Sequence, residues 1–259
     1  MEKEKRLWFV FCNDQLLVEE GADGHCAVPY QTEPPVPVNE WTHIHELSMF
    51  DGEMFNAYAV DHPVPEGNGR KMVGLRASFD CLIRSQYLKA GKAQELIYWD
   101  KNSRYCPVCA MPMAFHTSIS KRCTGCGKEI WPTVATAIIV RVTRGDEVLL
   151  VHARNFRGDY YGLVAGFVET GETLEECVQR EVMEETGLRI RNIRYFASQP
   201  WPYPCGLMVG FTAEYESGDI KLQASELSAG NFFTRDHMPD IPGKVSLARM
   251  LIDDWLQKK

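Results

Sequence analysis

Hydrophobic and polar positions change their spacing several times along the chain, and these changes predict where strands and helices lie. Apolar and polar residues alternate over residues 7–18 on either side of Asn13 and Asp14, a pattern typical of a β-hairpin. Similar alternation over residues 54–61 and 72–79 predicts two further strands. We therefore expect a small β-rich domain at the N-terminal end of the chain.

The spacing becomes helical between Asp80 and Trp99, where apolar residues recur at intervals of one helical turn. Gly91 interrupts this pattern. Because glycine weakens a helix interior, we expect one broken helix that leads into a cysteine-rich segment.

The second half of the chain combines strands with two amphipathic helices. Strands are predicted over residues 135–142 and 147–153, on either side of a turn at residues 144–146. One helix is expected to begin near Thr173, and another to span residues 246–257. This mixture indicates an α+β fold class.

The composition is that of an ordinary globular protein: of 259 residues, 45% are hydrophobic and 24% are charged. The formal net charge of −7 argues against a broad cationic surface that grips nucleic acid, so a bound polyanion would need the help of a metal. The longest apolar stretch, residues 134–140, is too short to cross a bilayer, and the first residues have no secretory signal pattern. We expect a cytoplasmic protein with no membrane partner.

Four of the nine cysteines form two close pairs, Cys106 with Cys109 and Cys123 with Cys126, and thirteen residues separate the pairs. Four thiolates at this spacing suit one tetrahedral zinc ion per chain. Such a site leaves no position for water, so this zinc is expected to hold the fold. The remaining cysteines lack paired spacing and are interpreted as packing residues: Cys12, Cys26, Cys81, Cys177 and Cys205.

Zinc ribbons often bind nucleic acid, but the basic residues near these cysteines are few: Lys121, Arg122 and Lys128. A scaffold role is therefore favoured. His116 in the same segment and His152 at a predicted strand end have no partner at metal-ligand spacing. Both are interpreted as surface or capping residues.

The helix that begins near Thr173 is well specified by its own residues. Thr173 and Glu176 stand in capping-box relation, and Gly187 is placed for a C-cap. The helix also carries an apolar stripe, which consists of Leu174, Cys177, Val178 and Val182.

Three carboxylates converge on one side of this helix. At about 100° per residue, Glu181, Glu184 and Glu185 project within one arc of roughly 100°. A run of charges is usually a solvated helix face, but these glutamates lie next to the apolar stripe and not opposite it. Like charges so placed call for a cation between them, and hard oxygen ligands select Mg²⁺ or Mn²⁺.

The segment Gly166–Glu172, followed by seven residues and then Arg180–Leu188, resembles the Nudix box of metal-dependent pyrophosphohydrolases. The resemblance implies that Glu185 is metal ligand or catalytic base, two roles that the sequence leaves unseparated, and that Arg180 orients neighbouring carboxylates. The implied catalytic residues are Glu185, Glu181 and Glu184. The implied Mg²⁺ or Mn²⁺ ligands are the carbonyl of Ala165 and the carboxylates of Glu181, Glu184, Glu185 and Glu226.

Residues 198–204, Ser-Gln-Pro-Trp-Pro-Tyr-Pro, begin ten residues after Leu188 and resemble the signature of NADH pyrophosphatases within the Nudix superfamily. Three prolines alternate with aromatic residues, which predicts a stiff loop that presents flat rings and exposed carbonyls to a nucleotide. A zinc ribbon before the catalytic domain matches the same family. The resemblance covers nearly the whole chain and is weakest before residue 70.

This resemblance implies a Nudix α/β/α sandwich with a mixed sheet, over residues 131–259. It is preceded by an N-terminal β-rich domain (residues 1–100) and the zinc ribbon (residues 101–130). The implied reactions are hydrolysis of NADH or NAD⁺ to nicotinamide mononucleotide and AMP, and of NAD-capped RNA to 5′-monophosphate RNA. The family also implies a homodimer.

Substrate contacts are carried over by position. Trp131 and Phe167 match an aromatic pair that stacks a base, and Arg76 and Ala248 match more distant contacts, although a surface charge and a packing residue are equally open interpretations. The proposed lining consists of Gln199, Pro200, Trp201, Pro202, Tyr203, Pro204, Cys205 and Gly206. Ser118 and Gly206 depart from the family pattern, which puts fine substrate preference in doubt.

Two alternatives stay open at this point. A Nudix box would serve equally well in a hydrolase of ADP-ribose or another nucleoside diphosphate derivative. The other alternative is a zinc-ribbon RNA-binding module with an inactive Nudix domain, although every carboxylate of the box is present.

Overall fold

The computed structural model describes residues 4–21 and 24–258, and the chain divides into two compact units. The first unit comprises Met1–Thr133 and Pro202–Cys205, and the second comprises Val134–Trp201 and Gly206–Lys259. Residues 1–3, part of the start that was searched for a signal pattern, lie outside the described residues. No helix within the described residues is long and apolar enough to span a membrane.

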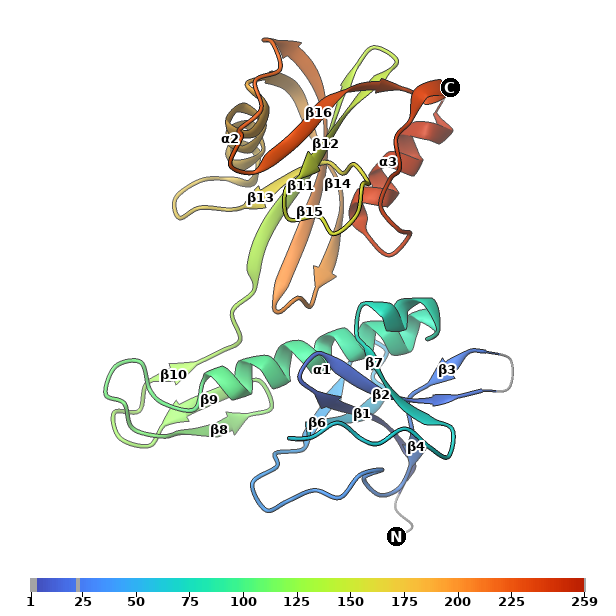
Figure 1. The fold of residues 1–259 in the computed structure, drawn as a ribbon. Coiled ribbons are helices and arrows are strands. Elements are labelled where there is room, and N and C mark those ends of the chain that lie inside the picture. The colour runs from blue at the N-terminus through green and yellow to red at the C-terminus, as the bar shows by residue number, and fades with distance from the viewer. Residues whose placement is uncertain (1–3, 22–23, 259) are drawn as a thin grey trace. The chain divides into compact units, whose positions relative to one another are not determined.

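A seven-stranded sheet forms the framework of the first unit (Figure 1). Its strands are β1 (Arg6–Cys12), β2 (Gln15–Glu20), β3 (Cys26–Ala27), β4 (Tyr30–Gln31), β5 (His45–Ser48), β6 (Met54–Ala59) and β7 (Arg70–Gly74). The order is β3-β2-β1-β6-β5, with β4 beside β1 and β7 beside β2; β1 and β6 run parallel, and the other pairs are antiparallel. The predicted hairpin is confirmed, and Asn13 turns it with a φ of 55°.

The strand predicted over residues 72–79 is wrong in its second half. β7 ends at Gly74, and the chain then forms the 3-10 helix η1 (Ala77–Asp80). The buried hydroxyl of Ser78 donates a hydrogen bond to the carbonyl oxygen of Leu75 at 2.7 Å. This local bond closes the chain into a turn, and residue alternation does not reveal it.

The broken helix predicted between Asp80 and Trp99 is also wrong. The structure has one continuous helix, α1 (Arg84–Asn102), which runs through Gly91. A Cβ atom added to Gly91 would lie 3.2 Å from Cγ of Pro202, which belongs to the same unit. The glycine therefore permits close packing and does not end the helix.

The cysteine-rich segment forms a three-stranded antiparallel sheet of β8 (Met113–Thr117), β9 (Ser120–Cys123) and β10 (Glu129–Ile130). Buried Lys121 joins it to the rest of the unit, because its Nζ lies 2.5 Å from a carboxylate oxygen of Asp100 and 4.9 Å from the ring centre of Phe115. Asp100 also faces Nε2 of His45 at 3.4 Å. A separate ribbon domain over residues 101–130 stays a prediction.

The second unit contains a mixed six-stranded sheet. Its strands are β11 (Ala135–Arg144), β12 (Glu147–Ala153), β13 (Val164–Phe167), β14 (Arg189–Trp201), β15 (Gly206–Ser217) and β16 (Leu227–Thr234). The order is β14-β15-β11-β12-β16, with β13 also beside β11; β11 and β15 run parallel and the other pairs are antiparallel. The predicted turn at residues 144–146 is confirmed, and Gly145 has a φ of 58°.

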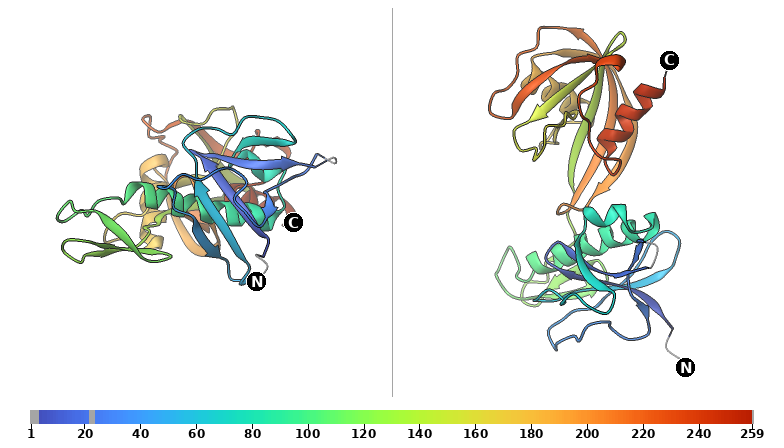
Figure 2. Two further views of the ribbon diagram at one scale, coloured as in Figure 1. Left: turned by 90° about the horizontal axis from the view of Figure 1, so that it is seen from below. Right: turned by 45° about the vertical axis from the view of Figure 1, so that its right-hand side comes forward.

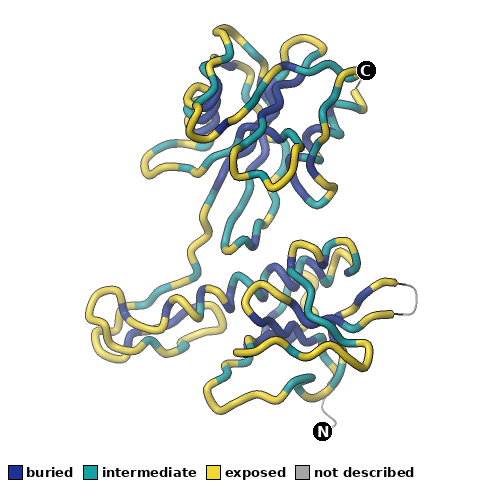
Figure 3. The backbone as a smooth tube through the Cα atoms, viewed as in Figure 1, coloured by how far each residue is buried: buried dark blue, intermediate teal, exposed yellow. Residues whose placement is uncertain are grey.

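Two helices cover opposite faces of this sheet, as Figures 1 and 2 show. Helix α2 (Leu174–Thr186) shares one apolar core with Ile138, Val140 and Phe211, whereas α3 (Leu247–Gln257) shares another with Ile139 and Leu150. The short helix η2 (Arg235–His237) follows β16. Buried chain runs through the centre of the unit in Figure 3. The predicted α/β/α sandwich with a mixed sheet is confirmed.

The proline-rich segment is not a loop throughout its length. Residues 198–201 belong to β14 and pair with β15, where Ser198 stands opposite Val209 and Gln199 opposite Met208. Only residues 202–205 form the turn. β14 lies at the edge of the sheet, where Pro200 can lack an N–H without breaking a ladder on both sides.

Candidate active site

Helix α2 carries the candidate catalytic carboxylates, and local hydrogen bonds fix both of its ends. Oγ1 of Thr173 accepts a hydrogen bond from the backbone N–H of Glu176 at 3.2 Å, and the Glu176 carboxylate accepts one from the N–H of Thr173 at 2.7 Å. At the other end, Gly187 has a φ of 72° and its N–H donates to the carbonyl of Met183. The predicted capping box and C-cap are confirmed, so the start and end of the helix are set by sequence.

The carboxylate of Glu181 lies directly against strand β13. A Cβ atom added to Gly166 would fall 2.0 Å from Cδ of Glu181, a distance at which the atoms overlap. Glycine at position 166 therefore makes the space that the carboxyl group occupies. Glu181 is 9% exposed, and Val178 and Val182 next to it belong to the buried core.

Arg180 ties the carboxylates of α2 to the preceding loop. Its Nη1 donates to Glu181 at 2.8 Å and to Glu184 at 3.1 Å, and its Nε and Nη2 donate to Glu172 at 3.0 and 2.6 Å. Nη2 also donates to the carbonyl of Phe167 at 3.0 Å. The bonds from Arg180 are the main reason that the pKa of Glu172 falls to about 2. One guanidinium thus positions two α2 carboxylates and both ends of the loop.

Glu185 is the most buried of the three α2 glutamates, at 5% exposure. Among the described residues, its carboxylate makes no hydrogen bond or ion pair. Burial raises its pKa to about 8, and the charges of Glu181, Glu226 and Glu184 add to the rise. The carbonyl of Glu185 accepts a hydrogen bond from the N–H of Gln223 at 2.9 Å, which holds the turn with Glu226 against the end of α2.

The carboxylates of Glu181, Glu184, Glu185 and Glu226 form an electrostatically unbalanced group. Arg180 offsets part of the charge of Glu181 and Glu184, but the buried Glu185 has no cationic partner among the described residues. Burying an unpaired carboxylate is costly, and a divalent cation with hard oxygen ligands would remove that cost. These carboxylates are the kind of ligand that hard divalent cations take, but among the described residues no three of them bring oxygen atoms within 4.8 Å of one another. Ala165 directly precedes Gly166 in β13.

The four paired cysteines come together in the first unit. Their sulfur atoms all lie within 4.8 Å of one another, and within the described part of the chain they are the one such group of three or more His, Cys, Asp or Glu ligand atoms. Cys106 and Cys126 have their sulfurs 3.7 Å apart, and Cys109 and Cys123 have theirs 3.4 Å apart. This arrangement fits one tetrahedrally bound ion.

The two cysteine pairs sit in matching backbone turns. The N–H of Ala110 donates to the carbonyl of Cys106 at 2.9 Å, and the N–H of Gly127 donates to that of Cys123 at 3.2 Å. Ala110 and Gly127 have φ angles of 59° and 73°. Backbone N–H groups also point at sulfur, and the one from Cys126 is the main reason that the pKa of the Cys123 thiol falls to about 6. The turn at Cys123 therefore favours the thiolate of that residue, which is the metal-binding form.

Comparison with known proteins agrees with this geometry. The NUDIX domain model matches residues 131–253, and the model of the NADH pyrophosphatase-like rudimentary NUDIX domain matches residues 5–99. A Stutzerimonas stutzeri protein named NAD-capped RNA hydrolase NudC is 38% identical over 216 residues, which cover 82% of this chain and 77% of that protein. The protein of the same name from Photorhabdus laumondii is 41% identical over 193 residues, 72% of this chain and 74% of the relative. The chain belongs to the Nudix family, in the group of these NudC proteins.

The Nudix fold is also seen in a solved structure. A NUDIX hydrolase from Nitrosomonas europaea superposes with a TM-score of 0.52 at 21% identity, and the match covers 60% of this chain and 90% of that protein. At this level of identity the likeness concerns the fold alone.

The residues predicted to bind substrate are spread over both units of this Nudix protein. Trp131 follows β10 in the first unit and Phe167 ends β13 in the second, and both rings are exposed. The side chain of Gln199 is already engaged, because its Nε2 donates to the carbonyl of Val245 and its Oε1 accepts from the N–H of Leu247, each at 2.7 Å. Gln199 therefore anchors the start of α3, a role that the sequence did not indicate.

The remaining predicted contacts differ in character. Arg76 is exposed at the start of η1. Burial raises the pKa values of Tyr87 and Tyr203, and the charge of Arg76 opposes part of this rise. The hydroxyls of these two tyrosines lie 2.7 Å apart. Ala248 is buried in the core beneath α3, as the packing interpretation has it.

Both departures from the family pattern have a clear structural setting. Ser118 is exposed in the turn between β8 and β9. A Cβ atom on Gly206 would approach the carbonyl oxygen of Trp201 to 3.0 Å, which leaves little room for the usual serine. This close approach of the two hairpin strands accounts for glycine at position 206.

Sequence reasoning missed Glu172 as a site residue. The motif assigns Glu172 no role of its own. In the structure its two carboxylate oxygens accept hydrogen bonds from Arg180, and one of them also accepts a hydrogen bond from the N–H of Glu169 at 2.6 Å. The two residues lie eight positions apart: Arg180 is in α2, and Glu172 ends the preceding loop, in which Gly171 has a φ of 96°. Such an ion pair can be predicted from the sequence only when the conformation of the loop is known.

Proposed function

We propose that this Nudix protein hydrolyses the diphosphate of NADH and NAD⁺ to nicotinamide mononucleotide and AMP, and that of NAD-capped RNA to 5′-monophosphate RNA. The family membership and the names of the relatives support this proposal. The observation that carries it is the buried Glu185 among Glu181, Glu184 and Glu226, since this group is suited to a cation that binds a phosphoanhydride.

Mg²⁺ or Mn²⁺ is the proposed catalytic metal, with the carbonyl of Ala165 and the carboxylates of Glu181, Glu184, Glu185 and Glu226 as its ligands. When bound, such ions offset negative charge on the phosphate oxygens and lower the pKa of a water molecule. Arg180 keeps the carboxylates of Glu181 and Glu184 in place through 2.8 and 3.1 Å hydrogen bonds.

Glu185 is the proposed general base. Its carboxylate takes a proton from the attacking water, whose oxygen forms a bond to phosphorus while the bond from that phosphorus to the bridging oxygen breaks. A base works best when its pKa is near the working pH, and burial already raises that of Glu185 far above its ordinary value. A cation next to the carboxylate pulls the value back down, so the ionised form is present when substrate binds.

Zinc is the proposed ion of the four-cysteine cluster, one per chain, and its role is structural. All four ligands come from the protein, which leaves no coordination position for substrate or water. The ribbon also contributes Lys121 to the buried contacts of the first unit. Loss of the ion should therefore lower the stability of this unit and leave the catalytic step itself unaffected.

Base recognition is proposed for Trp131 and Phe167, with further contacts from residues 199–206, Arg76 and Ala248. The exposure of the Trp131 and Phe167 rings supports stacking, because a flat unburied ring costs little to cover with a base. The buried side chain of Ala248 weakens its case. A homodimer remains part of the proposal.

Comparing turnover of NADH, ADP-ribose and NAD-capped RNA by the purified protein with Mg²⁺ or Mn²⁺ tests this function. We expect AMP and nicotinamide mononucleotide from NADH, and 5′-monophosphate RNA from the capped RNA. Faster hydrolysis of ADP-ribose than of either NAD substrate would contradict the assignment in favour of a general Nudix hydrolase. Tight RNA binding in EDTA with no product from any substrate would instead favour an inactive binding module.

A further inference from the structure

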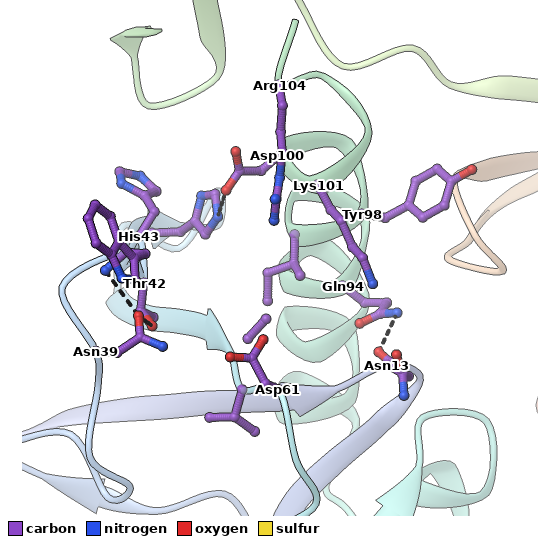
Figure 4. A pocket seen from close by; sticks show the side chains of 15 residues that line it. Asn13, Asn39, Thr42, His43, Asp61, Gln94, Tyr98, Asp100, Lys101 and Arg104 are labelled. Atoms are coloured by element: carbon purple, nitrogen blue, oxygen red, sulfur yellow. Dashed lines mark hydrogen bonds and ion pairs between the residues drawn. The ribbon is translucent and has the colours of Figure 1, made fainter. Parts of the chain in front are cut away.

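A cavity of about 560 Å³ lies within the first unit, and none of the proposed catalytic or substrate-binding residues lines it. We call it the α1 cavity, because Gln94, Ile97, Tyr98, Lys101 and Arg104 in and just after α1 form one wall. Figure 4 shows Asn39, Thr42 and His43 on the other side, with Asp61 between the two walls. The volume is in the range of small-molecule sites.

One side of the α1 cavity offers flat rings. Trp41 is 88% exposed, which is unusual for so large an apolar side chain. His43 stacks on Phe115 with ring centres 3.9 Å apart and nearly parallel planes. This second ring is thus held rigidly, and burial lowers the pKa of His43, which favours the neutral imidazole. Rings of this kind are suited to stacking with a planar heterocycle.

The opposite side carries two cations without partners. Among the described residues, neither Lys101 nor Arg104 makes an ion pair or a side-chain hydrogen bond. The nearby carboxylate of Asp100 does not neutralise them, because it is already paired with Lys121 at 2.5 Å and faces His45 at 3.4 Å. The cavity therefore has positive charge available at one end, which suits a phosphate group.

Each wall of the cavity also carries an amide group, Asn39 on the side of the rings and Gln94 on the side of the cations. Nε2 of Gln94 donates to the carbonyl of Asn13 at 3.1 Å, but Oε1 of Gln94 is buried and has no hydrogen-bond partner. Oδ1 of Asn39 accepts hydrogen bonds from the N–H of Trp41 and the hydroxyl of Thr42, which fixes the orientation of its amide. Because Oε1 of Gln94 has almost no accessible surface, it offers no contact to a ligand in the cavity.

We propose that the α1 cavity binds a nucleoside monophosphate unit, with the base against Trp41 and His43 and the phosphate against Lys101 and Arg104. The carboxylate of Asp61 would accept hydrogen bonds from the sugar or the base. The cavity contains no arrangement of nucleophile and base that suggests chemistry, so this is a binding site. The unit can be a free mononucleotide or one nucleotide of an RNA chain, which present the same groups.

Calorimetric titration of the full-length protein with AMP tests this site. No Mg²⁺ or Mn²⁺ is added, so the carboxylate site lacks its cation. No chelator is added either, so the zinc stays in place. We expect saturable AMP binding that becomes at least tenfold weaker in Trp41→Ala and in the double variant Lys101→Ala/Arg104→Ala. Arg84→Ala removes one charge from the first turn of the same helix and should leave the affinity unchanged. All four changed positions are exposed, and equal melting temperatures would show that the variants fold.

The same titration with a 5′-phosphorylated single-stranded pentanucleotide identifies the source of the ligand. An oligonucleotide that competes with AMP and is weakened by the same variants would show that the cavity holds a nucleotide of RNA. AMP binding without such competition would show that it holds a free mononucleotide. The proposal is overturned if no AMP binds at millimolar concentration, or if binding is equal in the wild type, Trp41→Ala and Lys101→Ala/Arg104→Ala. Neither result depends on the reaction proposed for the Nudix domain.

Discussion

The thiols of the first unit and the carboxylates of the second unit gather potential metal ligands in opposite ways. The four sulfurs approach within 4.8 Å of one another, and backbone N–H groups point at Cys106 and Cys123. Among the α2 carboxylates, Glu181 and Glu184 form ion pairs with Arg180. Burial, together with the like charges nearby, raises the pKa of Glu185 to about 8. The protein thus supplies a converged set of four thiol ligands in one unit and a set of carboxylates with uncompensated charge in the other.

This difference indicates which site performs chemistry. A closed set of four thiolates satisfies an ion fully, and its binding free energy supports the fold. An incomplete carboxylate set keeps room for substrate oxygens and water, and it reduces stability when no cation is bound. The following changes test the contrast in order of decreasing effect.

Glu185→Gln should have the largest effect. The amide keeps the shape of the side chain but cannot accept a proton as a base and binds a cation weakly. We expect a loss of about 10³-fold or more in kcat for NADH with Mg²⁺, measured as AMP release. The melting temperature of the metal-free protein should not fall, since the amide replaces a carboxyl group whose pKa of about 8 keeps it largely protonated near neutral pH. A variant that keeps near-wild-type activity would contradict the role of Glu185.

Cys106→Ser should act on stability and not on chemistry. Removing one of four thiolates weakens zinc binding, and we expect a loss of at least about 3 kcal/mol in unfolding free energy together with less soluble protein. Zinc content and urea unfolding measure this effect. Cys12→Ser changes a buried cysteine outside the cluster and should keep the zinc. A zinc-free Cys106→Ser protein of normal stability would remove the structural role.

Gly166→Ala tests the position of the Glu181 carboxylate. The added methyl group overlaps the site of Cδ, so Glu181 must move away from β13. We expect kcat to fall about 10²-fold, because catalytic groups tolerate little displacement. Gly171→Ala, in the loop that follows β13, meets no atom within 4 Å and is a control for the effect of an added methyl group without the clash, apart from strain at its φ of 96°. Equal activity of Gly166→Ala and wild type would show that Glu181 need not stay where it lies.

The pH dependence of stability should differ between the metal-free and the Mg²⁺-loaded protein. The Glu185 pKa rises from 4.5 to about 8 on folding, so between these values the unfolded chain gives up the proton first. Unfolding free energy should therefore fall as pH rises from about 4.5 to about 8, by at most about 5 kcal/mol. Urea unfolding at several pH values measures it. The fall in unfolding free energy should be smaller in Glu185→Gln and in the wild type with Mg²⁺ than in the metal-free wild type. An equal fall in all three would show that Glu185 does not cause it.

Ala110→Gly should have the smallest effect. Ala110 has a φ of 59° where the matching turn of the other cysteine pair has Gly127, so glycine should relieve backbone strain. Glycine also gains freedom in the unfolded chain, which opposes the benefit. We expect a stability gain below about 1 kcal/mol in thermal unfolding, with unchanged zinc content and activity. A clear loss of stability would show that the two turns are not equivalent.

Sequence patterns predicted the parts of this structure that local interactions determine. The capping box at Thr173, the C-cap at Gly187 and the hairpin turn at Asn13 all depend on neighbouring residues, and each is confirmed. The continuous α1 was missed, because Gly91 owes its presence to packing against a proline more than a hundred positions away.

The same distinction applies to the candidate site. The spacing of Glu181, Glu184 and Glu185 follows from helix geometry; Glu181 and Glu185 are buried beside the apolar stripe, whereas the side chain of Glu184 is 52% exposed. The grip of Glu172 on Arg180 and the engagement of Gln199 with α3 depend on loops that bring distant residues together. The α1 cavity likewise combines four separate segments, which no single pattern reveals.

The central claim is that the α2 carboxylates bind a catalytic cation. Its most direct test is to titrate protein that lacks Mg²⁺ and Mn²⁺ with Mn²⁺ and to measure bound Mn²⁺ by electron paramagnetic resonance and NADH hydrolysis in the same samples. The account predicts that bound Mn²⁺ and activity rise together in the wild type, and that Glu185→Gln reduces both while Cys12→Ser reduces neither. Hydrolysis that proceeds without any divalent cation, or Mn²⁺ binding that is the same in Glu185→Gln, would contradict it.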